Sequence, residues 1–271
     1  MSTADAGLRW RTGWLAPEQV HLLTAVSGVK VLPGVSPLLF DPSHASLQRL
    51  QMDSAARVLG ARRLLVLDER GAVAAHPRVA ALFEALATPQ RHLRLVETSS
   101  TASRTCRVSA RGDIVAVMQS HEGLGLFDIA DASDEGCLQA MVVAIAGSAP
   151  GEREPSSTLS GDPIRIPVEE WRAFREGRAP REGSTPAGAA LTRMRRGSDS
   201  GTIIDVVVTS LSGTVLRGSE HVGFFEPDGL GWDLEVEFDD AGTARSVVAT
   251  PSTHAKWAAA VSSKARELQA P

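Results

Sequence analysis

The sequence contains no tyrosine and no asparagine, and only Lys30, Lys256 and Lys264 of its 28 basic residues are lysine. All three residue types have AT-rich codons, so a GC-rich genome explains their scarcity without any reference to mechanism. The only two cysteines, Cys106 and Cys137, fit no metal-binding spacing and are too few for a disulfide framework. We therefore expect two buried or half-buried thiols in a reducing compartment.

Long apolar runs and an excess of basic charge are also missing. No stretch approaches the roughly 18 apolar residues of a membrane span, and Met1–Trp14 has no apolar core of the kind found in signal peptides. The net charge is −4 and the pI is about 6.0, whereas nucleic-acid proteins usually carry a basic face. We expect a soluble, cytoplasmic protein that binds no nucleic acid and does not insert into a membrane.

Catalytic and metal-binding motifs are absent as well. Residues 213–219 have the glycine spacing of a phosphate loop but lack its lysine, so we expect a hairpin there. The seven histidines are scattered, and His121 stands beside Glu122 without an identifiable catalytic partner. We therefore expect neither an enzyme nor a cofactor. A small-molecule-binding protein or an enzyme of unrecognised class is an alternative, which a deep polar pocket around His121 or His221 would favour.

What the sequence does contain is a pattern that runs twice. From about residue 91 to 146, short alternating strands lead into one amphipathic helix, and the same order recurs from about 201 to 268. Residues 147–163 between them have linker composition. The pattern predicts two related α/β halves, 1–150 and 151–271.

Helices are expected where a proline opens an apolar stripe. Such prolines are Pro17, Pro77, Pro167, Pro186 and Pro251, the last preceded by Thr250 as N-cap. A further helix is expected from about residue 43 to 59, with Leu47, Leu50 and Val58 facing inward.

One strand and one aromatic pair carry specific expectations. Apolar residues at 232, 234, 236 and 238 alternate with Asp233, Glu235 and Glu237, which predicts a half-buried antiparallel strand with an acidic outer face. Phe224 and Phe225 are consecutive on a strand, so their side chains should point to opposite faces of the sheet.

A second alternative is a winged-helix DNA-binding element over residues 43–110, formed by two helices and a hairpin. Arg62 and Arg63 would lie in its first connection. Its recognition helix, around Val79–Leu86, would carry only Arg78, which is poor for contacts to phosphates.

Over nearly its full length the sequence resembles the EspG family, cytosolic chaperones of actinobacterial type VII (ESX) secretion. The resemblance is carried by 15–19, 64–71, 76–82, 86–89, 201–208, 212–213, 232–234 and 250–251. It implies an α+β fold: a quasi-two-fold body with a central, mostly antiparallel β-sheet flanked by two helical bundles.

The resemblance also implies a function. EspG proteins bind the tip of PE–PPE heterodimers, cover an aggregation-prone helical end and help direct this cargo to its secretion machine. Their contact surface lies on the sheet and the C-terminal helical bundle. The family has no residue signature on that surface that carries over to this sequence. The candidate contact residues here are Phe224, Phe225, Trp257 and Val261. A homodimer is also plausible, because uncovered strand edges can pair with each other.

Overall fold

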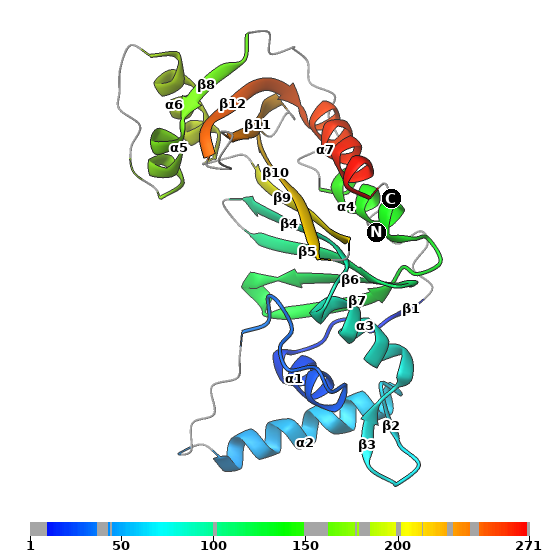
Figure 1. Cartoon of the computed structure of the whole chain (residues 1–271). Helices are drawn as coiled ribbons and strands as arrows, with labels where there is room; N and C mark the ends of the chain where they lie inside the picture. Colours follow the sequence, from blue (N-terminus) through cyan, green and yellow to red (C-terminus); the bar gives the residue numbers. More distant parts are fainter. Residues whose placement is uncertain are drawn as a thin grey trace. The chain divides into compact units, whose positions relative to one another are not determined.

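The computed structural model describes residues 10–36, 43, 45–99, 102–148, 162–176, 178, 185–198, 202–212, 214–226, 230–238 and 244–269. Within this part of the chain, seven α-helices accompany a sheet of ten strands and a separate sheet of two (Figure 1). The fold is therefore α+β with a large antiparallel sheet, as expected.

The ten strands are ordered β1-β7-β6-β5-β4-β9-β10-β11-β12-β8. Their bounds are β1 (Trp10–Arg11), β4 (Arg91–Ser99), β5 (Ser103–Arg111), β6 (Ile114–His121), β7 (Leu126–Asp131), β8 (Ile164–Pro167), β9 (Thr202–Ser212), β10 (Val215–Phe225), β11 (Leu230–Phe238) and β12 (Ala244–Thr253). The small sheet pairs β2 (Leu65–Leu67) with β3 (Val73–Ala75). The registers that the structure gives are all antiparallel.

The helices are α1 (Pro17–Val26), α2 (Ala45–Ala61), α3 (Pro77–Ala87), α4 (Cys137–Ala146), α5 (Val168–Arg175), α6 (Pro186–Ser198) and α7 (His254–Gln269). The prolines predicted to open helices do so at α1, α3 and α6, and Pro167 is the N-cap of α5. The repeated order is also confirmed along the chain: β4 to β7 precede α4, and β9 to β12 precede α7.

The last helix begins later than predicted. Pro251 does not open it; β12 continues to Thr253, and Pro251 pairs in the ladder with Trp232 of β11. The pairing of β12 with β8 ends at Ala249, so Pro251 lies beyond the last residue of β12 that β8 engages. Thr253 supports the true helix start, because its Oγ1 accepts a hydrogen bond from the Lys256 N–H at 3.3 Å.

The chain forms two compact units. Unit 1 comprises residues 1–92, 105–140 and 210–215, and unit 2 comprises 93–104, 141–209 and 216–271. Each unit thus draws on both predicted halves, since residues 210–215 at the end of β9 belong to unit 1. The Leu211 N–H donates there to the Gln90 carbonyl at 2.7 Å. Most of the predicted linker, residues 149–161, lies outside the described residues.

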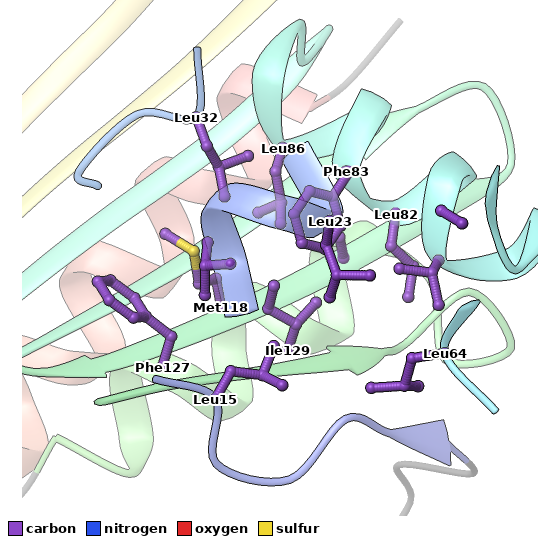
Figure 2. Packing of buried hydrophobic residues seen from close by; sticks show 14 of the residues in the cluster. Leu15, Leu23, Leu32, Leu64, Leu82, Phe83, Leu86, Met118, Phe127 and Ile129 are labelled. Atoms are coloured by element: carbon purple, nitrogen blue, oxygen red, sulfur yellow. The ribbon is translucent and has the colours of Figure 1, made fainter. Parts of the chain in front are cut away.

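The core of unit 1 joins the three helices α1, α2 and α3 to strands β6 and β7. Figure 2 shows Leu23 of α1, Phe83 and Leu86 of α3, and Met118 and Ile129 of the strands packed together. Two ion pairs at the sheet border this core: Arg11 with Asp128, and Arg78 with Asp131. The core thereby holds α1 and α3 against β6 and β7.

The strands of unit 2 are covered on both faces. On one face, α5 and α6 pack through Trp171, Leu191 and Met194 against apolar residues of β10, β11 and β12. On the other face, α7 contacts β11 and β12, with Trp257, Val261 and Ala265 fully buried. Figure 1 shows α5 and α6 beside β8 and β12.

None of the helices in the described part of the chain is both long and apolar enough to cross a membrane.

Candidate functional site

The four residues expected to contact a partner are interior residues of unit 2. The exposed fractions are 4% for Phe224, 2% for Phe225, and 0% for both Trp257 and Val261. The expectation that they form a surface is therefore wrong in this conformation. None of the four side chains can touch a partner unless unit 2 opens.

The two phenylalanines do point to opposite faces, as predicted. Phe224 packs against Trp171 and Phe174 of α5, with ring centroids 6.1 and 5.7 Å apart. Phe225 packs against His254 and Trp257 of α7 at 5.3 and 5.5 Å. Since helices cover both faces here, opposite orientation places both rings in a core rather than exposing one of them.

Glycine makes the packing on the α7 face possible. A Cβ added to Gly223 would lie 2.4 Å from the Phe225 ring and 3.0 Å from the Trp257 indole. A larger residue would therefore force the Phe225 ring to shift and would crowd the Trp257 indole. Gly223 pairs directly with Asp233 of β11, so the space above Gly223 that the Trp257 indole occupies lies on the same face of the sheet as the Asp233 side chain.

The acidic face of β11 is partly covered, which corrects the prediction of an acidic outer face. Burial, together with the neighbouring charge of Glu235, raises the pKa of Asp233 to about 6. The Oδ1 atom of Asp233 has no hydrogen-bond partner within the described residues. His221, cross-strand from Glu235, is also buried, and burial lowers its pKa. Asp233 and His221 are thus covered, while Glu235 on the same strand as Asp233 is exposed.

One exposed apolar surface lies on α2, where the structure reverses the predicted orientation. Leu47, Leu50 and Val58, expected to face inward, have exposed fractions of 52%, 64% and 41%. The side of α2 that packs on unit 1 is formed by Ala55 and Leu59. A spacing of three and then eight residues places the three exposed side chains on one side of the helix. We refer to Leu47, Leu50 and Val58 as the α2 stripe.

Exposed apolar residues are concentrated in unit 1 as a whole. Twelve large hydrophobic residues are exposed in the described part of the chain, and all but Val143 and Leu216 lie in unit 1, which leaves ten there. Single exposed apolar side chains are ordinary on protein surfaces. Leu47 and Leu50 are neighbours on one side of α2, and Val58 follows about 12 Å further along that side, beyond the polar Ser54. Grouped exposed apolar residues mark interaction sites more often than isolated ones do.

Unit 1 also contains a pocket beside His121, one of the two positions named for the small-molecule alternative. A cavity of about 400 Å³ is lined by His121 at the end of β6, by Arg107 of β5 and by the segment around Val35. His121 packs against Trp14, with ring centroids 5.2 Å apart. His121 is therefore the half-buried last residue of β6.

The winged-helix outline does not fit the geometry of unit 1. The β2–β3 hairpin lies between α2 and α3 in the chain, where a helix-turn-helix has only a short turn. Five residues of α3 are buried in the core, and its Arg78 is paired with Asp131. The helix that would enter a DNA groove is thus covered by its own protein.

No protein-family model matches this chain, and no curated protein matches it. The EspG resemblance therefore stays a prediction based on the residues that carry it. The α+β class and the large antiparallel sheet agree with it, but one fold hosts many functions. Function has to be argued from the surfaces described above.

Proposed function

We propose that this protein is a non-catalytic chaperone that binds a helical secreted partner of the PE–PPE type in the cytoplasm and escorts it to a type VII (ESX) secretion system. The observation that carries the proposal is the α2 stripe, an unpartnered apolar surface on a described helix. Chaperone action would be reversible burial of an apolar helical end of the cargo against this surface. The resemblance to EspG proteins supplies the cargo class.

The α2 stripe has the geometry of a helix-binding surface. The helix has 17 residues, which corresponds to about 26 Å at 1.5 Å per residue. Apolar side chains along one side of such a helix pack well against a second amphipathic helix. Burying each of the three half-exposed side chains would contribute about 1 kcal/mol. The rest of the interface must therefore supply most of the affinity of a stable complex.

A positive charge beside the α2 stripe indicates which charge a partner helix should carry. Arg57 is exposed and stands two turns after Leu50, on the same side of α2. A partner helix with an acidic residue at the edge of its apolar side would pair with this guanidinium. Such edge charges affect the rate of association and the register more than the affinity.

The contact surface proposed here differs from the one first expected. Phe224, Phe225, Trp257 and Val261 hold unit 2 together, so we assign them no contact with cargo. Their role in partner binding would be indirect, through the stability of the unit.

A pull-down of the tagged protein from the cytosol of its native host tests the proposal. Partners would be identified by mass spectrometry, and light scattering would give the stoichiometry. The proposal expects a stable complex with a helical, signal-less secreted pair. Recovery of the protein alone, as a monomer or as a homodimer, would contradict it.

One observation favours a second candidate function, the binding of a small molecule. This is the cavity beside His121 in unit 1. It would be compatible with a chaperone, because the cavity and the α2 stripe are formed by different residues.

A further inference from the structure

The cavity of unit 1 combines positive charge with apolar walls. Among its described lining residues, Arg107 and His121 are the only ionisable ones, and no carboxylate is present. Thr105 and Ser120 add hydroxyl groups, while Val35 and Phe127 add apolar surface. At about 400 Å³ the cavity falls within the range of small-molecule sites in proteins.

The strand geometry explains why the polar groups converge. Thr105 and Arg107 are two apart on β5 and so share one face of the sheet. Ser120 of β6 is the direct partner of Phe127 on β7. Figure 2 shows Phe127 at the opposite end of the core cluster from Leu64. The cavity therefore continues the core of unit 1 at the end where polar side chains replace apolar ones.

The opposite wall is held in place before any ligand binds. Gly34 has φ +81°, and a Cβ added there would lie 2.8 Å from the Arg107 guanidinium. Only glycine allows this backbone to approach the side chain so closely. Leu32 anchors the segment in the core, and the Ser36 carbonyl lies 2.8 Å from Nε2 of His21. A preformed wall lowers the entropy lost on binding.

We infer that this cavity binds a small carboxylate with an apolar body, the carboxylate at Arg107 and the apolar part against Phe127 and Val35. A guanidinium carries five N–H donors in a planar fork, so it can hold a carboxylate through two of them while the others serve the protein. The hydroxyls of Thr105 and Ser120 add donors for the second oxygen. This inference does not depend on the chaperone proposal.

Calorimetric titration of the full chain with three probes tests it: hexanoate, its uncharged analogue hexanamide, and inorganic phosphate. We expect hexanoate to bind at least about tenfold more tightly than hexanamide, because a charge-assisted hydrogen bond is stronger than a neutral one. We also expect hexanoate to bind more tightly than phosphate, because phosphate has no apolar part to pack against Phe127 and Val35. Equal affinity for the two organic probes, tighter binding of phosphate, or no heat from hexanoate up to about 10 mM would overturn the inference.

Matched variants locate the site. Arg107→Met keeps the apolar stem and removes the charge, so it should abolish the preference for hexanoate. Arg111→Met on the same strand, whose guanidinium pairs with Glu84, is the control and should bind as the unaltered protein does. Ser120→Leu fills the cavity and leaves Arg107 in place, so it should weaken both organic probes. Unchanged hexanoate binding by Arg107→Met and Ser120→Leu would contradict the assignment.

The indole of Trp14 provides a local readout in an NMR titration, because its ring lies beside His121. Hexanoate should shift the Trp14 indole N–H signal and leave those of Trp171, Trp232 and Trp257 in unit 2 unchanged. Shifts confined to the unit 2 signals would place the ligand elsewhere and overturn the inference. This measurement does not involve cargo, so its failure would leave the chaperone proposal standing.

Discussion

Phe225 of β10 packs edge-on against Trp257 of α7, with ring centroids 5.5 Å apart and an angle of 68° between the planes. Gly223 leaves the space that this contact needs. The contact fixes α7 to one face of the unit 2 strands, while Phe224 fixes α5 to the other. Two consecutive residues thereby connect two helices to the same strand, which makes them structural residues.

Trp257→Ala should therefore act on stability. Removing a fully buried indole is expected to lower the free energy of unfolding by about 3–5 kcal/mol. Urea unfolding followed by circular dichroism would measure this loss. Lys256→Ala, at the exposed neighbouring position, should change it by less than about 0.5 kcal/mol. A stable, folded Trp257→Ala variant that loses cargo binding would instead restore the indole as a contact residue.

Asp233 should make the protein less stable as the pH rises. Its pKa is about 6 in the folded protein against an ordinary value of 3.8, so the folded state holds the proton more tightly. The stabilisation is complete below pH 4 and is lost as the pH rises through 6. The free energy of unfolding of Asp233→Asn should thus be higher than that of the unaltered protein by about 1–3 kcal/mol at pH 8. The two proteins should be equally stable near pH 4.

Urea unfolding at pH 4, 6 and 8 would measure this difference. Glu235→Gln is the matched variant, since it removes the neighbouring charge and keeps the Asp233 carboxyl. At pH 8, Glu235→Gln should raise the free energy of unfolding by less than Asp233→Asn does. A constant difference between Asp233→Asn and the unaltered protein at all three values would show that the carboxyl does not titrate in this range.

Asp131 should have the opposite pH dependence. Burial would raise its pKa, but hydrogen bonds from the Ser133 hydroxyl and backbone N–H, together with Arg78, lower it overall. Its contribution to stability is therefore present above the ordinary pKa and is lost as the pH falls below it. Asp131→Asn should lower the free energy of unfolding by about 1–3 kcal/mol at pH 7, and by less at pH 3.

Thermal unfolding at both pH values would test this, with Asp113→Asn in the exposed β5–β6 turn as control. An equal loss for Asp131→Asn at pH 7 and pH 3 would exclude the ionised carboxylate as the cause.

Cys137 should be chemically inert in the native protein. Burial raises the pKa of its thiol to about 11, and the charge of Arg91 only partly opposes this. At pH 8 about one thiol in a thousand would be ionised, and the thiolate is the reactive form. Iodoacetamide should label Cys137 slowly until urea unfolds the chain, as peptide mass spectrometry would show. Rapid native labelling would indicate that α4 opens readily.

The sequence predicted which residues share a side of an element better than it predicted which side is covered. Apolar spacing in α2 located the helix, yet Leu47 and Leu50 face outward because Ala55 and Leu59 occupy the packed side. The opposite orientations of Phe224 and Phe225 followed from the strand period alone. Their burial depends on α5 and α7, which meet β10 from distant parts of the chain.

Local rules were also overridden where tertiary pairing competes with them. Thr250 and Pro251 form a good helix start by composition, but the ladder with Trp232 and Asp233 keeps them in β12. The cavity had no local signal either. Arg107 and His121 belong to different strands, and only the antiparallel arrangement of unit 1 brings both to one cavity.

The central claim is that the α2 stripe binds the cargo, and one comparison tests it most directly. The affinity of the purified cargo pair would be measured calorimetrically for the unaltered protein, for Leu47→Glu combined with Leu50→Glu, and for Arg49→Glu. Arg49 is exposed on another side of α2, and its substitution changes the net charge by the same amount. We predict a loss of at least about 30-fold for the double variant and near-native affinity for Arg49→Glu. Unchanged affinity of a folded double variant would contradict the account.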